Sequence, residues 1–264
     1  MKGKTGTMKN PGREINLATI DEHALQLAEK YDLGIELDQF CTAMYMDMPE
    51  FPSWDADVSK YLPRARVFHG PFNEICPCAI DPKVRALSME RYNQAFELMW
   101  RYGVKKLILH GGYIPLVYYP KWYIEQSILF WKEFLADKPE DLILCLENVM
   151  EPEPSFLVQI VAEVDDPRCR LCLDTGHANI KNTSSIPITE WVREFSPYLV
   201  HVHLHNNDGE WDQHNNLAEG TIPMNDMLVL LDELAPSASF TFENTNDSEQ
   251  SILWYRKKYN ERDL

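Results

Sequence analysis

Short apolar segments alternate along this chain with longer segments in which apolar residues recur at helical spacing. The segments KKLILHGGY at 105–113 and DLILCLENV at 141–149 are apolar over the length of a strand, which is typical of strands covered on both faces. Residues 81–102 instead carry apolar side chains at the spacing of one helix face, namely Val84, Leu87, Ala95, Phe96 and Met99. The pattern therefore predicts strands and helices in alternation.

Eight strands are predicted in all. The other six are expected at residues 14–19, 34–37, 65–72 and 170–178, in the stretch that begins at Val200, and in SFTFENTN from Ser239. Further helices are expected at 21–31, 121–136, 188–195, 225–234 and 248–259. A separate short helix is expected to end near Leu62. This order and the length of 264 residues predict a single (β/α)8 TIM barrel over residues 13–264. Residues 1–12 are expected to form a flexible polar leader.

Polar residues able to bind a metal end each predicted strand from the third onward. They are His69, His110, Glu147, Asp174, His203 and Glu243. Because barrel enzymes place their chemistry at the C-terminal ends of the strands, these side chains are expected to converge at one mouth. An open doubly wound sheet, the alternative fold, would not bring so many strand ends together. The chain also lacks a glycine-rich loop of the dinucleotide-binding kind.

The stretch HVHLHNNDGEWDQH has the densest candidate chemistry. At the two-residue period of a strand, His201, His203 and His205 face one way. Buried imidazoles are costly unless a metal or hydrogen-bond partners satisfy them, and the loop that follows carries Asp212 and His214. Carboxylate and imidazole ligands suit zinc, manganese or iron. For any one of these residues taken alone, the alternative to metal binding is an ordinary core histidine or an aspartate on a solvated acidic loop.

Charge argues against a nucleic-acid partner. The chain has 25 basic and 41 acidic residues, a net charge of −16, and such a field repels polyanions. The segment after His69 contains no lysine or arginine before Lys83, so it offers no phosphate contact beside the predicted mouth.

The chain's six cysteines and its short apolar runs predict a cytoplasmic protein without a membrane partner. Cys169 and Cys172 form a single C-x-x-C pair without the second pair of a zinc knuckle. Buried free thiols in a reducing cytoplasm explain them better. The apolar runs are far shorter than a membrane span, and the N-terminus lacks the apolar core of a signal peptide.

Seven motifs together resemble the xylose isomerase-like TIM barrels, which include endonuclease IV (AP endonuclease family 2) and many sugar and sugar-phosphate isomerases and epimerases. They are FHGPF, LILHGG, LCLENV, LCLDTGHA, HVHLHNND, DQHNNLAEGTI and FTFENT. The resemblance implies a metal quartet of Glu147, Asp174, His203 and Glu243. It implies further ligands of the endonuclease IV branch at His69, His110, His177, Asp212 and His214. The expected cofactor is a divalent metal, zinc or manganese, at one to three ions per chain.

The isomerase and epimerase branch implies a different use of the same site. There Glu147 and Glu243 would flank the sugar carbon and move its proton, while the metal polarises adjacent oxygens. Glu153 matches a further substrate-contacting glutamate of several ketose epimerases. Two departures are Asn206, where many relatives have aspartate, and His214, where those epimerases typically have arginine.

Other residues are candidates for the surroundings of the site. His205 is expected in a supporting or substrate-facing position. Trp54 and Trp211 are expected in a sugar pocket, with ordinary packing as the alternative. His201 is expected deeper in the barrel, in a hydrogen-bonded layer, and Glu36 is expected inside the barrel as a support for the ligands.

Three functions follow from these observations. The first is a metal-dependent isomerase or epimerase of a small sugar or sugar phosphate, which the acidic surface favours. The second is a multinuclear zinc phosphoester hydrolase of the abasic-site endonuclease type, which the full ligand set favours. The third is a non-enzymatic barrel with a decayed site, and the intact ligands count against it. The sequence specifies neither the substrate nor the oligomeric state.

Overall fold

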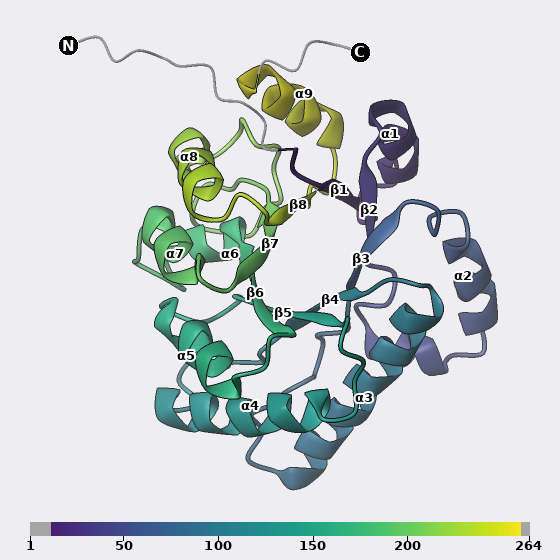
Figure 1. The fold of residues 1–264 in the computed structure, drawn as a ribbon, viewed down its shortest axis with the longest axis vertical. Helices are drawn as coiled ribbons and strands as arrows, with labels where there is room; N and C mark the ends of the chain where they lie inside the picture. The colour runs from purple at the N-terminus through teal and green to yellow at the C-terminus, as the bar shows by residue number, and fades with distance from the viewer. Residues whose placement is uncertain (1–11, 260–264) are drawn as a thin grey trace.

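Eight parallel strands pair in chain order and close into a barrel in the computed structural model, which describes residues 12–259 (Figure 1). The strands are β1 (Ile15–Ala18), β2 (Gly34–Leu37), β3 (Ala65–His69), β4 (Lys106–His110), β5 (Ile143–Glu147), β6 (Cys169–Asp174), β7 (Leu199–Leu204) and β8 (Ser239–Phe242). The ring closes where β1 pairs with β8, with Ile15 opposite Phe240. The predicted (β/α)8 barrel is therefore confirmed.

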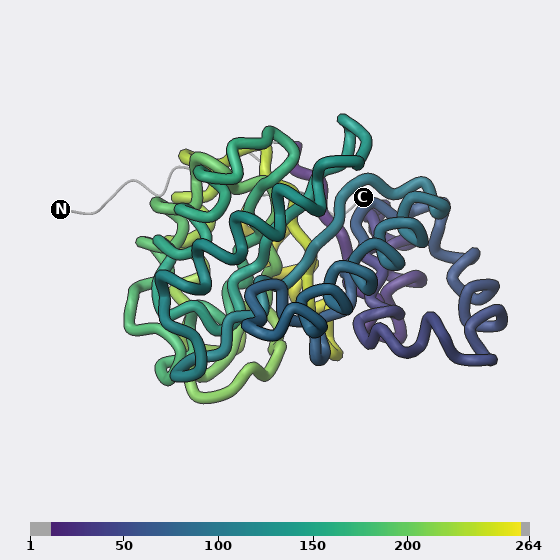
Figure 2. Tube along the Cα trace, turned by 90° about the horizontal axis from the view of Figure 1, so that it is seen from below, coloured from purple at the N-terminus to yellow at the C-terminus, as the bar shows by residue number. Residues whose placement is uncertain are grey.

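Helices cover the outside of the ring (Figure 1). They are α1 (Ala24–Tyr31), α3 (Pro82–Arg101), α4 (Pro120–Leu135), α5 (Ser155–Val164), α7 (Ile188–Phe195), α8 (Met224–Leu234) and α9 (Ser248–Lys258). The 3-10 helix η1 (Ala43–Asp47) and α2 (Phe51–Val58) lie between β2 and β3 and extend to one side of the barrel (Figure 2). The short helix α6 (Thr175–Asn179) follows β6 directly. No helix in residues 12–259 is long and apolar enough to cross a membrane.

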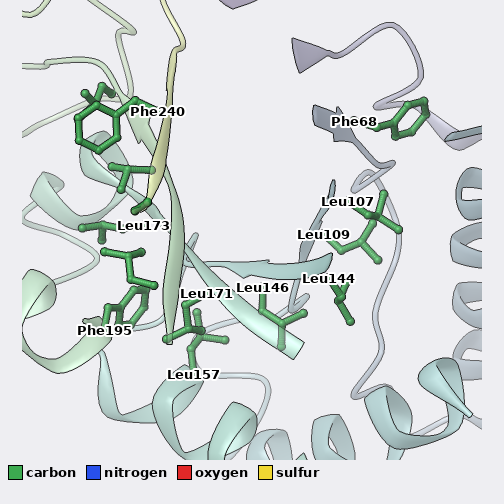
Figure 3. Packing of buried hydrophobic residues seen from close by; sticks show 14 of the residues in the cluster. Phe68, Leu107, Leu109, Leu144, Leu146, Leu157, Leu171, Leu173, Phe195 and Phe240 are labelled. Carbon is green, nitrogen blue, oxygen red and sulfur yellow. The ribbon is translucent and has the colours of Figure 1, made fainter. Parts of the chain in front are cut away.

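The main core lies between the strands and the helices. Outward side chains such as Phe68, Leu107, Leu146 and Phe240 are fully buried there (Figure 3). Each buried side chain of this size contributes about 1.5–3 kcal/mol. The inward residues of β3 to β6 form a smaller buried cluster inside the ring, composed of Val67, Ile108, Cys145 and Cys172. Two positions later on each strand the inward side chain is polar, so the apolar layer supports a polar one at the mouth.

Several predicted boundaries differ from the structure. The strand expected at 170–178 ends at Asp174, because the Asp174 carboxylate accepts a hydrogen bond of 2.7 Å from the His177 backbone N–H and caps α6. The strand expected at 105–113 ends at His110, because Gly112 has φ +70° and turns the chain away. The helix expected at 81–102 forms, but Val84 and Leu87 lie on its exposed side.

Two other differences concern whole segments. No helix is predicted at α5, although its buried residues recur at helical spacing and its polar residues lie on the opposite face; the buried residues are Phe156, Leu157, Ile160, Val161 and Val164. The leader expected at 1–12 lies almost entirely outside the described residues. All six cysteines are free, as expected, and all except Cys41 are buried.

Candidate metal centre

Six strand ends meet at the C-terminal mouth of the barrel, as their positions in the sequence predict. His110 of β4 is the register partner of Glu147 in β5, and Asp174 of β6 is the register partner of His203 in β7. Parallel pairing therefore places imidazole beside carboxylate on adjacent strands. His69 reaches the same place from β3, with its Nε2 atom 3.2 Å from the Glu147 carboxylate.

His203 lies at the centre of the predicted quartet. Its Nδ1 atom is 3.5 Å from Glu147, 3.7 Å from Asp174 and 3.6 Å from Glu243, measured to the nearest carboxylate oxygen. This nitrogen is buried and has no hydrogen-bond partner in the described part of the chain. Ligand atoms held at about 2.1 Å from one ion in a tetrahedral arrangement are roughly 3.4 Å apart. The donor types, and the three distances from His203 Nδ1, are therefore those expected for ligands of a single divalent cation.

Glu36 lies deeper in the barrel than the quartet and fixes the orientation of the His203 ring. Its carboxylate is 3.1 Å from His203 Nε2 and 3.2 Å from His201 Nε2, and Thr241 donates its hydroxyl to the same carboxylate. Burial alone would raise the pKa of Glu36, but the charge of His203 and the two imidazole hydrogen bonds hold that pKa well below its ordinary value. A charged Glu36 accepts the Nε2 proton of His203, so Nδ1 is the nitrogen that would bind an ion after losing its own proton.

A second ligand set lies beside the quartet. The ligand atoms of His69, His110 and Glu147 are all within 4.8 Å of one another. His69 Nδ1 is 2.9 Å from the Gly70 carbonyl oxygen, so His69 turns its Nε2 atom toward the shared glutamate. His110 Nε2 is 3.3 Å from Glu147, and the Phe72 ring stacks on the His110 imidazole with centroids 4.6 Å apart.

A third ligand set comes from α6 and the loop after β7. That loop folds back through an antiparallel bridge between Asn206 and Asn215. The Asp212 carboxylate thereby lies 3.2 Å from His177 Nε2 and 2.9 Å from His214 Nε2. The structure brings together all nine side chains that the sequence predicts as ligands.

Burial and neighbouring charges shift the pKa values of the clustered side chains in different directions. Burial, together with the charges of Asp174 and Glu147, raises the pKa of Glu243 to about 8. Burial would also raise the pKa of Glu147, yet the neighbouring histidines hold it well below its ordinary value. Burial lowers the pKa of His214, but the hydrogen bond to Asp212 and the charge of Glu243 outweigh it and raise that pKa to about 9. Without an ion, the cluster therefore retains protons that a cation would displace.

The predicted substrate-binding residues lie in different surroundings. His205 is buried, with Nε2 3.0 Å from the Asp174 carboxylate and its ring stacked on His214 at 4.0 Å between centroids. Trp211 is on the loop after β7, and its side chain is 75% exposed. Trp54 is on α2 and packs edge-on against Tyr45, in a separate groove of about 510 Å³. Glu153 is exposed and bonds to the Ser155 hydroxyl at 2.8 Å.

Three residues near the mouth were not predicted as site residues. Glu151 is buried and accepts hydrogen bonds from the Tyr123 hydroxyl and the Val149 backbone N–H. Cys41 places its Sγ atom 3.5 Å from His69 Nδ1. Asp38 follows β2, and burial together with the charge of Glu36 raises its pKa to about 7. A search for polar strand ends that began at the second strand would have found Asp38.

Comparison with known proteins agrees with this architecture. The family model described as xylose isomerase-like TIM barrel matches residues 39–258. Among curated relatives, the uncharacterized protein MJ1311 of Methanocaldococcus jannaschii is 28% identical over 204 residues, which are 71% of this chain and 69% of the relative. The uncharacterized protein MJ1614 of the same organism is 23% identical over 225 residues, or 81% and 72% of the two chains.

Solved structures extend the comparison. A D-tagatose 3-epimerase-like protein superposes with a TM-score of 0.76 at 21% identity, over 94% of this chain and 98% of that one. The TTHB071 protein of Thermus thermophilus, soaked with ZnCl2, gives 0.72 at 23% identity, over 95% and 100%. A Methylomonas D-allulose 3-epimerase in complex with D-allulose gives 0.71 at 17% identity, over 96% and 100%. At these identities the structures show a shared fold.

Proposed function

The chain belongs to the xylose isomerase-like TIM barrel family, and we propose that within it this protein is a metal-dependent isomerase or epimerase of a small sugar or sugar phosphate. The observation that carries the proposal is the buried quartet in which Glu147 and Glu243 both lie within 3.6 Å of His203 Nδ1. Each glutamate has two carboxylate oxygens, so each can contact an ion and a substrate atom together. The sugar epimerases among the solved structures support the substrate class.

The two glutamates are suited to opposite steps of a proton transfer. Glu147 has a depressed pKa and is a carboxylate at neutral pH, so it can accept a proton from the sugar carbon. An ion would displace the proton that Glu243 holds in the metal-free protein, so Glu243 would deliver a proton through the carboxylate oxygen that does not contact the ion, after taking that proton from solvent. A zinc or manganese ion held by Glu147, Asp174, His203 and Glu243 would polarise the sugar oxygens beside that carbon.

The residues around the quartet would position the sugar. Phe72 stacks on His110 and presents a partly exposed ring, 37% accessible, beside the ligands. Aromatic faces suit the apolar C–H side of a sugar ring. His205 is fully buried, contacts Asp174 and stacks on His214, so it would hold these two side chains in position.

The informative experiment is solvent exchange at carbon. Metal-replete protein should incorporate deuterium from D2O into at least one member of a panel of ketoses and ketose phosphates, detected by mass spectrometry. Glu147→Gln and Glu243→Gln should each abolish that exchange. Glu163→Gln, a matched change at a glutamate on the outer helix α5, should leave the rate unchanged.

A phosphoester hydrolase is the second candidate, because the two further ligand sets gather around the quartet as the endonuclease IV branch implies. A net charge of −16 opposes tight duplex binding, which depends on neutralising phosphates with lysine and arginine. We expect no incision of abasic duplex DNA at physiological salt. Robust incision, with no deuterium exchange across the sugar panel, would replace the isomerase with the hydrolase.

A further inference from the structure

A groove of about 390 Å³ lies at the N-terminal end of the barrel, on the face opposite the metal centre. Its lining comes from the segments that precede β1, β2 and β3 and from the end of α9. Helices α1 and α9 contact each other beside it (Figure 1). Four arginines line the groove: Arg13, Arg64, Arg66 and Arg256.

The groove concentrates positive charge in an acidic protein. Against its four arginines stand two lining carboxylates, Glu14 and Asp32, and Asp232, which pairs with the buried Arg13 guanidinium at 3.0 Å, while the whole chain has a net charge of −16. Glu14 lies 3.6 Å from Lys106, at the floor of the barrel. Asp32 pairs with Arg64 through a side chain that is 94% exposed, where water screens the interaction. Among residues 12–259, no carboxylate forms an ion pair with Arg66 or Arg256.

Backbone carbonyl groups hold the guanidinium groups of Arg66 and Arg256 in place and leave most of their N–H donors available. Arg256 donates from Nη2 to the Tyr31 carbonyl oxygen at 2.8 Å and lies over the Tyr31 ring. Arg66 donates from Nη1 to the Ala65 carbonyl at 2.9 Å. Each of these arginines uses one terminal nitrogen, and a guanidinium carries five N–H donors. Capping the end of α1 needs one cation, so helix capping does not explain the cluster.

We propose that this groove binds a small phosphorylated anion. The planar fork of arginine matches phosphate oxygens in a bidentate manner, and groups already held by the backbone lose little entropy on binding. The volume is in the range of small-molecule sites, about 300–1,000 Å³, which suits a phosphate monoester or a diphosphate better than a macromolecule. The groove thus gives the protein a second ligand site, separate from the metal centre.

Inorganic pyrophosphate is the probe, titrated into the full-length protein by calorimetry, both as purified and after removal of bound metal by a chelator. Binding is expected in both preparations and should weaken with added NaCl. Arg66→Ala and Arg256→Ala should each weaken it about tenfold, the loss expected for one charge-assisted hydrogen bond. Arg256→Lys keeps the charge and should lose less than Arg256→Ala.

The matched control is Arg193→Ala on α7, an exposed arginine 3.5 Å from Glu190, which should bind pyrophosphate as the unmodified protein does. Thermal melting of each variant separates loss of binding from loss of folding, and Arg256→Lys serves if an alanine variant does not fold. The proposal fails if Arg66→Ala and Arg256→Ala bind with unchanged affinity, if Arg193→Ala loses as much, or if binding disappears with the metal.

Discussion

His203 has its two ring nitrogens in opposite surroundings, and the difference decides what the cluster can do. Nε2 faces the buried carboxylate of Glu36, whereas Nδ1 faces three carboxylates at 3.5–3.7 Å. Supporting carboxylates of this kind set the tautomer of a ligating histidine and increase its basicity. The nitrogen that can bind an ion is therefore chosen by a residue from the other side of the barrel.

Replacing Glu36 with glutamine should weaken metal binding without removing a ligand. The amide can still accept from His203 but carries no charge, so we expect zinc or manganese affinity to fall about 10- to 100-fold. Calorimetric titration of metal-free protein measures this directly. Glu163→Gln is the matched control. An unchanged affinity in Glu36→Gln would mean that the histidine does not depend on this carboxylate.

Metal affinity should also depend on pH, because the ligands of the metal-free protein carry protons. The pKa of Glu243 is about 8, above the usual carboxyl value, so the carboxyl is protonated below pH 8 and an ion must displace that proton. Affinity should therefore rise with pH, by about tenfold per unit for each proton released, and the contribution of Glu243 to that rise should end near pH 8. Competition titrations across this range give the slope. Glu243→Gln should reduce the slope by one proton, and an unchanged slope would contradict this assignment.

Among the elements, the loop after β7 contributes two predicted ligands, Asp212 and His214, on which the expected number of ions depends. The Asn206–Asn215 bridge returns the chain over the mouth, and His214 adopts φ +51°. This left-handed conformation is uncommon for a residue other than glycine and marks a position held by its surroundings. The His214 Nδ1 atom is 2.7 Å from the Glu243 carbonyl oxygen, which ties the loop to the end of β8.

His214→Ala should lower the number of bound ions without unfolding the barrel. The variant removes one ligand of the set that contains His177 and Asp212 and leaves the quartet intact. Elemental analysis of purified protein should give more than one metal per chain before the change and fewer after it. His23→Ala, at an exposed histidine, is the control. One ion per chain in all three proteins would restrict binding to the quartet.

Helix α6 approaches the site so closely that only glycine fits at its second residue. A Cβ atom added to Gly176 would lie 1.9 Å from Cε1 of His205. Gly176→Ala should therefore displace the His205 ring, reduce stability by about 1–3 kcal/mol and weaken metal binding, as measured by melting and calorimetry. Gly103→Ala is the contrasting variant, because its Cβ meets nothing within 4 Å although its φ is +76°. It should cost stability but leave metal affinity unchanged.

The elements also show how far the sequence could predict this protein. A strand that is apolar except at its last residue predicts both a buried element and a polar mouth, which is why Glu147 and Asp174 could be identified. Local periodicity could have located α5, because its buried residues recur at helical spacing, but it cannot predict the capping by Asp174 that turns TGHAN into a helix. Glu151 and Cys41 reach the mouth through loop conformations, and these depend on tertiary contacts that no periodic pattern records.

At the scale of the whole molecule, the metal should stabilise the folded chain, because the unfolded chain has no assembled site. At a free ion concentration of about 100 times Kd, the gain is about 2.7 kcal/mol. For a domain of this size we expect the melting temperature to rise by about 5–10 °C. Melting with and without zinc or manganese tests this, and Asp174→Asn should lose most of the increase. An equal shift in that variant would place the stabilising ion elsewhere.

The pairing of β1 with β8, which closes the barrel, has a consequence for the synthesis of the protein. It joins parts of the chain that are made far apart in time, since the Arg13 side chain donates to the Ala238 carbonyl, 225 residues further along. A growing chain on the ribosome has an unpaired edge on β1, and unpaired edges invite association with other chains. The quartet likewise has no Glu243 until β8 has been made. An ion that needs the whole quartet would therefore bind only after the last strand has been translated.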